Sequence, residues 1–331
     1  MLIFAGVDGT GATPLARFDA GYTPVYQNSH VSKLSRYACW ADKTQYDRGP
    51  GLLGIETGGL AHSAVNHVVR YWDSSVSKVF LAGFSRGAAA VIESAKILKG
   101  YGIPVECLIL FDPVDRSYVG GVGGWSLLSG SDTPIVSTVK HCIKVLRHPA
   151  SASRESFGNC GSRFESPNTK IYPLLVPATH GGVGGTPWPE SFVPPGSIYI
   201  DEGMVKNNPL GIDIGYEPHE IDGMTRVTPA QDRAGSAASW SFVTGILSPI
   251  IDQAMLDAGD ATAPRRSENM VPGRTEARAL HIVKPGESLS LIALKYYGSF
   301  NRWGDIYQAN LSTIGSNPNL IQPNMELVIP V

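Results

Sequence analysis

Three short apolar segments alternate with helical segments in the first third of the chain. The segments LIFAGV (2–7), SKVFLAG (77–83) and ECLILFD (106–112) are almost continuously apolar, which is typical of strands buried on both faces. Apolar residues at helical spacing in 56–72 and an alanine-rich stretch at 86–99 predict helices between these strands. The alternation predicts an α/β fold, a mostly parallel sheet with helices on both faces.

Further segments continue this pattern to about residue 259. The sequence predicts a helix over 137–146, a strand over 170–177 that Pro173 breaks, and a late helix within 235–258. The stretch at 117–133 is rich in glycine and serine and also carries apolar residues. Two interpretations of this stretch stay open, a lid over a binding site and an ordinary surface loop.

Charge and hydropathy exclude some classes of function. With 27 basic and 29 acidic residues the formal charge is −2, which argues against nucleic-acid binding. No apolar run approaches about 20 residues, so we expect no transmembrane segment. The N-terminal apolar run has no basic region before it and no small-residue cleavage site after it, so we expect a core strand rather than a signal peptide. These features predict synthesis in a bacterial cytoplasm.

The four cysteines do not have the CxxC spacing of redox or metal sites. Cys107 lies in a predicted buried strand and is expected to be a packed thiol. A disulfide between Cys142 and Cys160 is one alternative, and free thiols at both positions are the other. The fourth cysteine is Cys39.

A serine stands between two glycines where the 77–83 strand gives way to a helix. The sequence Gly83-Phe84-Ser85-Arg86-Gly87 has the pattern of a nucleophile elbow. In such a turn the serine oxygen stands clear of the sheet, and the N–H of Arg86 points at the developing oxyanion. A plain glycine-rich turn has the same pattern, so the prediction of a nucleophile depends on partners for Ser85.

A serine hydroxyl needs a base, and in this architecture the chain order is Ser, then Asp or Glu, then His. Asp112 ends the 106–112 strand at the same sheet edge as Ser85, because Pro113 stops the strand there. We therefore assign Asp112 as the acid that orients the base. Asp115 is its rival, and a turn cap is the alternative role for Asp112.

The best base among the eight histidines is His180. It follows a predicted strand and opens the stretch HGGVGG, whose glycines allow a loop to fold closely over Ser85. A structural histidine is the alternative interpretation. The other candidates are His30, His62 and His67, which precede the serine, His141 and His148 beside the predicted 137–146 helix, His219 in an acidic stretch, and His281 near the C-terminus.

Four ordered motifs also resemble a known family. They are DGTG at 8–11, GFSRGA at 83–88, FDPV at 111–114 and HGGVGG at 180–185. This set resembles the DUF2235 α/β-hydrolase domain, the catalytic domain of type VI secretion lipase effectors of the Tle1 class, over about residues 1–190. That family has a DGT segment, a GFSRGA elbow, a strand ending in Asp-Thr-Val and a His-Ser-Asp-Val-Gly-Gly loop.

The resemblance implies that Ser85 is the nucleophile, Asp112 the orienting acid and His180 the base. This sequence departs from the family at Pro113, where the family has threonine, and at Gly181-Gly182, where it has Ser-Asp. These departures bear on the choice of substrate more than on the chemistry.

The resemblance also extends to the oxyanion hole. It implies that Gly9 or Thr10 in the DGT turn supplies a second donor beside the N–H of Arg86, or that Asp8 makes a structural contact there. Ester hydrolysis by such a site needs no metal or other cofactor.

A second unit follows a change of composition after about residue 259. We expect an α/β-hydrolase domain over 1–259, a linker rich in proline, glycine and charge over 260–279, and a small domain over 280–331. The small domain reads strand, helix, helix, strand, with Ser288 as a helix cap. Its opening VKPGESLSLIALKYYG, its central WGDIYQAN and its closing NPNLIQPNMELVIP resemble a LysM domain over its full length.

This resemblance implies a βααβ module that binds N-acetylglucosamine-containing glycans such as peptidoglycan. A docking or delivery role without tight glycan affinity is the alternative. Trp303, Tyr296 and Tyr307 are expected in the core rather than as sugar platforms. The glycan groove is expected between two loops, Pro285, Gly286, Glu287 and Ser288 in the first, and Asn319, Leu320, Ile321 and Gln322 in the second.

The candidate triad predicts a serine esterase or lipase, and the resemblances imply a phospholipase delivered as an antibacterial effector, with a glycan-binding LysM module. The expected partners are a lipid or other ester, peptidoglycan, a secretion-machine component and an immunity protein, and the expected place of action is the periplasm or envelope of a target cell. A cell-wall esterase is the second enzymatic hypothesis. A non-catalytic glycan-binding or tail-associated protein is the hypothesis from another class.

Overall fold

The computed structural model describes residues 1–10, 29–36, 40–51, 56–115, 134–148, 160–187, 227–259, 277–297, 300–315 and 317–330. Contacts within the chain divide it into two compact units, Met1–Ser267 and Glu268–Val331. The predicted linker at 260–279 spans this division. Most of it, residues 260–276, and the predicted loop at 117–133 lie outside the described residues.

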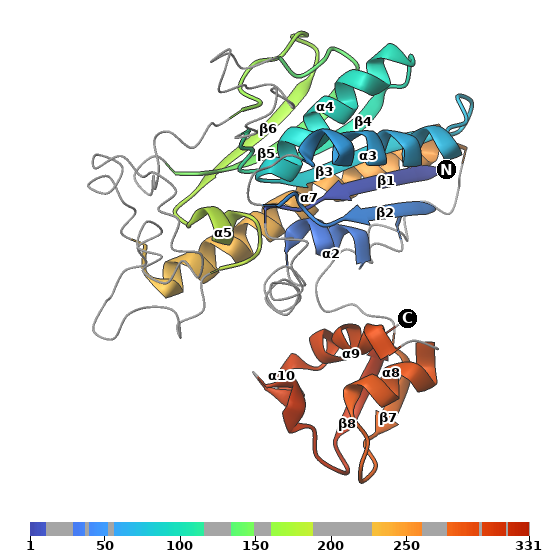
Figure 1. The fold of residues 1–331 in the computed structure, drawn as a ribbon, viewed down its shortest axis with the longest axis vertical. Coiled ribbons are helices and arrows are strands. Elements are labelled where there is room, and N and C mark those ends of the chain that lie inside the picture. The colour runs from blue at the N-terminus through green and yellow to red at the C-terminus, as the bar shows by residue number, and fades with distance from the viewer. Residues whose placement is uncertain are drawn as a thin grey trace. The chain divides into compact units, whose positions relative to one another are not determined.

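The described part of the first unit contains a parallel sheet with the strand order β2-β1-β3-β4-β5-β6 (Figure 1). Every residue of β1 and β4 is buried, as their near-continuous apolar sequences predict. The predicted α/β fold is confirmed. The strands are β1 (Leu2–Val7), β2 (Lys43–Asp47), β3 (Lys78–Phe84), β4 (Val105–Phe111), β5 (Val139–Arg147) and β6 (Lys170–Val176).

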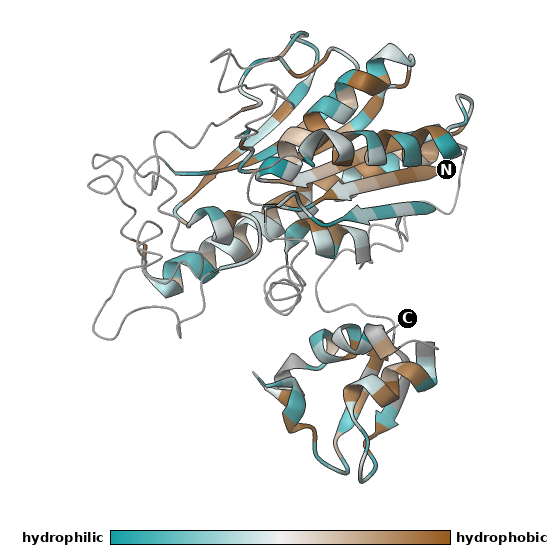
Figure 2. Ribbon diagram, viewed as in Figure 1, coloured by the Kyte–Doolittle hydropathy of each residue, from teal (hydrophilic) through white to brown (hydrophobic). Residues whose placement is uncertain are grey.

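Helices cover both faces of this sheet. On one face α3 (Thr57–Tyr71) and α4 (Arg86–Gly100) pack against each other and against β1 and β3. Leu108 and Leu110 of β4 belong to the apolar core on that face, so the ring of Phe111 points to the other face. There it contacts His30, which in turn stacks on Trp240, so α2 (His30–Arg36) and α7 (Pro229–Asp257) cover that side. Figure 2 shows the hydrophobic strands enclosed between these helices.

Helix α7 is longer than expected from the sequence. It begins at Pro229 rather than at 235, because Thr228 and Gln231 form a capping box: the Thr228 hydroxyl accepts from the Gln231 N–H at 3.1 Å, and the Gln231 side chain accepts from the Thr228 N–H at 2.9 Å. By length and composition α7 is apolar enough to cross a membrane, which we did not expect. Its buried side packs against α5 (His180–Val183), β4, β5 and β6, as a helix that covers a sheet does.

The predicted helix over 137–146 is wrong, because this segment is strand β5. Apolar residues at Val139, Ile143 and Leu146 have helical spacing, but β5 lies between two strands, and its consecutive residues 142–145 are all buried. Burial on both faces removes the alternation that would have marked a strand, and the β-branched Val139 and Ile143 favour the extended form. Pairing with β4 and β6 therefore decides the conformation.

The predicted break at Pro173 does not occur, since β6 runs from Lys170 to Val176 without interruption. In the described part of the sheet β6 pairs with β5 alone, with Lys144 opposite Pro173. Proline lacks an N–H, and an edge strand tolerates it because one side of the strand has no ladder to complete.

The second unit has the predicted strand–helix–helix–strand order, with a short extra helix. Its strands β7 (Ala277–Ile282) and β8 (Glu326–Pro330) pair antiparallel. Ile292 and Ile306 form its core with residues of β8, and Tyr296, Trp303 and Tyr307 pack against that core. The helices are α8 (Leu289–Tyr297), α9 (Trp303–Ala309) and α10 (Leu311–Ile314), with 3-10 turns η5 (Phe300–Arg302) and η6 (Pro318–Leu320).

Candidate active site

Ser85 occupies a sharp turn between β3 and α4. Its backbone has φ 55° and ψ −126°, a conformation that side-chain-bearing residues rarely adopt, and α4 begins at the next residue. A Cβ on Gly83 would lie 2.4 Å from the Ala88 Cα, and a Cβ on Gly87 would lie 2.2 Å from the carbonyl oxygen of Val7. Both flanking glycines are therefore required by close backbone approach.

The main chain of Ser85 ties this turn to the end of β4. Its N–H donates to the Phe111 carbonyl at 3.1 Å, and its carbonyl accepts from the Val114 N–H at 3.1 Å. Asp112 lies between these two residues. The side chains at the carboxyl ends of β3 and β4 are thus held at one edge of the sheet, and Ser85 is 6% exposed.

His180 meets Asp112 at this edge. The His180 Nδ1 lies 2.6 Å from Asp112 Oδ2, and the His180 ring lies 4.7 Å, centroid to centroid, from the ring of Phe84, which precedes Ser85. The carboxylate that reaches this histidine is Asp112, while Asp115 is buried nearby. Asp112 has a φ of 40°, so its backbone is also strained.

Arg147, the last residue of β5, was not predicted and also contacts Asp112. Its Nε lies 2.5 Å from the same Oδ2 that meets His180, and both side chains of this ion pair are buried. Burial acts to raise the pKa of Asp112, but the positive charge of Arg147 and the hydrogen bond to His180 outweigh it and hold that pKa below its usual range. Asp112 is therefore an ionised acceptor at neutral pH.

A buried network beneath His180 was also missed. Asp232 of α7 accepts from both the N–H and the hydroxyl of Thr179 through one oxygen, Oδ1, at 2.8 Å each. The Thr179 hydroxyl in turn accepts from the Gly182 N–H at 3.0 Å and caps α5, the short helix that begins with His180. This network connects the histidine loop to the helix that covers the sheet.

The DGT turn lies against the serine turn. A Cβ on Gly9 would lie 3.3 Å from the Ser85 Cβ, and the Arg86 guanidinium donates to the Thr10 hydroxyl at 3.2 Å. The Gly9 N–H donates to the side chain of its neighbour Asp8 at 2.9 Å, so this N–H already has an acceptor within the turn. Asp8 is fully buried and also accepts from the hydroxyls of Ser29 and Tyr46, so it makes the structural contact that the resemblance implies.

The other histidines belong to several different elements. His30 is buried between Phe111 and Trp240, and burial, together with the charge of Lys33, lowers its pKa well below the usual value. His62 and His67 lie in α3, His141 and His148 belong to β5 and the residue after it, and His281 belongs to the second unit, while His219 lies outside the described residues.

Cys107, Cys142 and Cys160 are free and buried thiols, so the disulfide alternative for Cys142 and Cys160 is wrong, while Cys39 lies outside the described residues. Among the described residues, no group of three His, Cys, Asp or Glu side chains is arranged to hold a metal ion.

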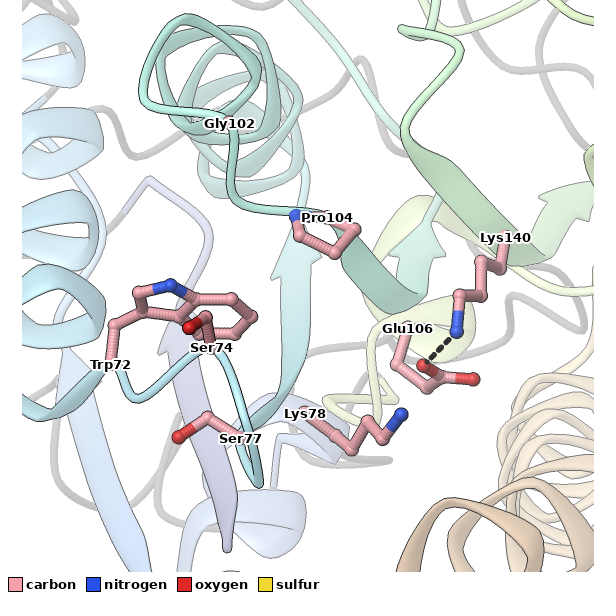
Figure 3. A pocket seen from close by; sticks show the side chains of 8 residues that line it. All are labelled: Trp72, Ser74, Ser77, Lys78, Gly102, Pro104, Glu106 and Lys140. Carbon is pink, nitrogen blue, oxygen red and sulfur yellow. Dashed lines mark hydrogen bonds and ion pairs between the residues drawn. The ribbon is translucent and has the colours of Figure 1, made fainter. Parts of the chain in front are cut away.

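A cavity of about 240 Å³ lies at the opposite edge of the sheet. Figure 3 shows its lining, in which Trp72 faces Lys78 and the ion pair between Lys140 and Glu106, whose atoms are 2.7 Å apart. Lys78 begins β3, and Glu106 and Lys140 lie near the starts of β4 and β5. This cavity is therefore separated by the length of the strands from Ser85.

The first of the two predicted glycan loops follows β7. Gly286 has a φ of +82°, which favours glycine, and the Ser288 hydroxyl accepts from the Leu291 N–H at 3.3 Å as a cap of α8. Glu287 accepts from the Lys284 N–H at 2.8 Å and lies 2.7 Å from His281 Nε2. These hydrogen bonds hold the pKa of Glu287 below its usual range.

The second predicted glycan loop precedes β8. Asn319 donates its N–H to Asn317 at 3.0 Å, Leu320 is 58% exposed, and Ile321 packs partly against the core. Ile282 at the end of β7 pairs with Glu326 at the start of β8, so the two loops leave the same end of this ribbon.

Comparison with known proteins identifies the second unit. Residues 281–330 match the model of the LysM domain family. The predicted LysM domain is confirmed. No curated protein matches the chain in sequence.

Three solved structures are similar to the chain at low identity. The Tle1 effector bound to the VgrG spike from the Type 6 secretion system has a TM-score of 0.35 and 14% identity over 56% of this chain and 51% of its own. An uncharacterized protein from Pseudomonas aeruginosa has a TM-score of 0.34 and 12% identity over 98% of this chain and 65% of its own. The RedJ-thioesterase of the prodiginine biosynthetic pathway in Streptomyces coelicolor has a TM-score of 0.32 and 13% identity over 56% of this chain and 81% of its own.

The chain thus spans about half the length of the Tle1 effector chain and about two thirds of the Pseudomonas aeruginosa chain. With TM-scores below 0.5, none of these likenesses carries an argument about function.

Proposed function

We propose that the first unit is a serine hydrolase in which Ser85 is the nucleophile, His180 the base and Asp112 the acid that orients the base. The observation that supports this most directly is the 2.6 Å contact between His180 Nδ1 and Asp112, at the sheet edge where Ser85 occupies a strained turn. An acceptor at Nδ1 holds the proton on that nitrogen and leaves Nε2 free of a proton, as a general base requires.

The reaction then proceeds through an acyl-enzyme. The Ser85 oxygen attacks the carbonyl carbon of an ester while its proton passes to His180 Nε2. The oxyanion accepts from the N–H of Arg86 at the start of α4 and from that of Thr10 in the DGT turn, where the Gly9 N–H already donates to Asp8. When the intermediate collapses, His180 gives its proton to the leaving alcohol. Water next attacks the acyl-enzyme, again losing a proton to His180, and the acid is released with the free serine.

The test of this chemistry is covalent labelling of the full chain with a fluorophosphonate probe. We expect wild type to be labelled, Ser85→Ala to be unlabelled, and Asp112→Asn to be labelled at least about 100-fold more slowly. Ser241→Ala, an exposed serine on α7, is the matched control and should behave like wild type. A folded wild type that takes up no label would refute the hydrolase and favour the non-catalytic hypothesis.

For the substrate we propose a lipid ester, in particular a membrane phospholipid, and we propose delivery as an antibacterial effector with an immunity partner. These steps rest on the resemblance of four ordered motifs to lipase effector domains. Vesicles of bacterial phospholipid should release fatty acid or lysolipid with wild type and none with Ser85→Ala. Release of acetate or other acyl groups from peptidoglycan instead would favour the cell-wall esterase, which the LysM domain on the same chain makes the second candidate.

For the second unit we propose binding of peptidoglycan glycan between the loops that hold Gly286, Glu287 and Ser288 and that hold Asn319, Leu320 and Ile321. The full chain should sediment with purified sacculi, and Leu320→Ala should weaken this binding. Phe300→Ala is the matched control, because Phe300 is also half exposed but lies outside both loops. No sedimentation of wild type would leave LysM as a docking module, and equal loss in both variants would contradict the assignment of the loops.

A further inference from the structure

We propose that Arg147 is a positioning residue of this hydrolase, one that fixes the Asp112 carboxylate and keeps His180 in its neutral form at lower pH than an unassisted aspartate–histidine pair would. The inference rests on the proposed function. It concerns a residue that neither the motif set nor the chain order of the proposed triad includes.

The geometry places two groups around one oxygen atom of Asp112. Arg147 Nε lies 2.5 Å and His180 Nδ1 lies 2.6 Å from Asp112 Oδ2. The Arg147, Asp112 and His180 side chains are 7%, 4% and 15% exposed, so water screens these contacts weakly. Asp112 also donates its N–H to the Val145 carbonyl at 2.8 Å, which aligns it with the end of β5.

The strained backbone of Asp112 gives the contact with Arg147 a role beside the contact with His180. Asp112 has a φ of 40°, and a relaxed backbone conformation would turn its carboxylate elsewhere, so the surrounding contacts hold the residue in place. The guanidinium of Arg147 forms an ion pair with the carboxylate at 2.5 Å and does not lose its charge in the protein. It therefore restrains the carboxylate from the β5 side while His180 meets it from the α5 side.

The charge balance sets the direction of the effect on His180. Without Arg147, the aspartate–histidine pair has a charge of −1, and protonation of the imidazole makes it neutral. With Arg147, the resting group is neutral, and protonation adds an unbalanced positive charge in a buried place. Arg147 therefore opposes the imidazolium form and lets His180 act as a base in more acidic solution.

Other ionisable groups near this edge come from each neighbouring element. Among the described residues, the charges of Arg147 and His180 act on the pKa of Asp112 and lower it. The other groups are Asp8 and Arg86 beside the nucleophile, His30 on α2, Asp232 on α7, Asp115 after β4 and His148 after β5.

The test is the pH dependence of fluorophosphonate labelling of the full chain. Arg147→Gln should label about 10-fold more slowly at pH 8, and the midpoint of the acid limb should move about one unit toward higher pH. Arg147→Lys keeps the charge without the planar fork, so its midpoint should move less while its rate still falls. Lys140→Gln removes a cation from the other end of β5, away from the site, and should leave rate and midpoint unchanged.

The possible outcomes separate the inference from the proposed function. An unlabelled, folded wild type would refute both. A labelled wild type whose Arg147→Gln variant folds and keeps the wild-type midpoint would refute the role of Arg147 alone. If Arg147→Gln does not fold, Arg147→Lys decides: wild-type rate and midpoint in that variant would contradict positioning by the guanidinium, and a slower rate supports it.

Discussion

Asp232 offers the sharpest test of how the histidine loop is held. This carboxylate is fully buried in α7, and its Oδ1 accepts two hydrogen bonds from Thr179, the residue before His180. A Cβ on Gly182 would lie 2.0 Å from the same oxygen, so the loop passes directly over it. Replacing Asp232 by alanine removes this acceptor, so the buried N–H and the buried hydroxyl of Thr179 lose their hydrogen bonds to it.

The magnitude follows from these two donors. A buried donor that loses its partner costs about 1–3 kcal/mol, so two of them should lower the free energy of unfolding by about 3 kcal/mol. With a urea m-value of about 3 kcal/mol/M for a unit of this size, the midpoint of unfolding should fall by about 1 M. Asp232→Asn keeps an oxygen at this place and should lose less.

The assay is urea unfolding of the full chain followed by tryptophan fluorescence, with labelling by the fluorophosphonate probe as a second readout. Asp257→Ala is the matched control, since Asp257 ends the same helix and accepts an exposed hydrogen bond from Gln253. Its midpoint should change by less than about 0.2 M. If Asp232→Ala unfolds at the same urea concentration as Asp257→Ala and labels at the wild-type rate, Asp232 does not hold the histidine loop.

Three further predictions concern buried groups. The folded state holds the pKa of His30 well below the usual 6.5. As pH drops below about 6.5, the unfolded state therefore binds a proton that the folded state does not, and the free energy of unfolding should fall. His30→Phe should flatten the fall in urea midpoint between pH 7 and pH 5; an unchanged slope would contradict this. Gly87→Ala has no room for its Cβ and should unfold the elbow, whereas Gly59→Ala in α3 meets open space and should keep or raise the melting temperature. Burial raises the pKa of the Cys142 thiol to about 12, so iodoacetamide at pH 8 should label Cys142 only after unfolding, as peptide mass mapping will check.

The central strands were predictable because their burial leaves a direct mark on the sequence. β1, β3 and β4 lie inside a covered parallel sheet, so nearly every residue is apolar, and helix α4 follows the serine turn at once. The same reasoning locates Ser85 and Asp112, since parallel strands that run side by side end at one edge. His180 follows from chain order and its glycine-rich context.

The residues that support the triad were not predictable in this way. Arg147 was missed because 137–146 was expected to be helical, and only a strand there ends beside Asp112. The β-branched Val139, Ile143 and Val145 were the signal that favoured a strand. Asp232 and Thr179 are 53 residues apart in the chain, and neither carries a local pattern that points to the other.

Backbone strain bears on whether the hydrolase site is maintained or decayed. Among the described residues other than glycine, three have positive φ: Ser85, Asp112 and Asn324. The two in the first unit are the proposed nucleophile and orienting acid, and each such conformation costs about 1–3 kcal/mol that a glycine would largely avoid. A chain without selection for chemistry at this edge would gain stability from substitutions at both positions. This chain instead has a serine and an aspartate at these positions, together with a histidine and an arginine that meet the same carboxylate oxygen, which favours an enzyme over a binding protein with a decayed site.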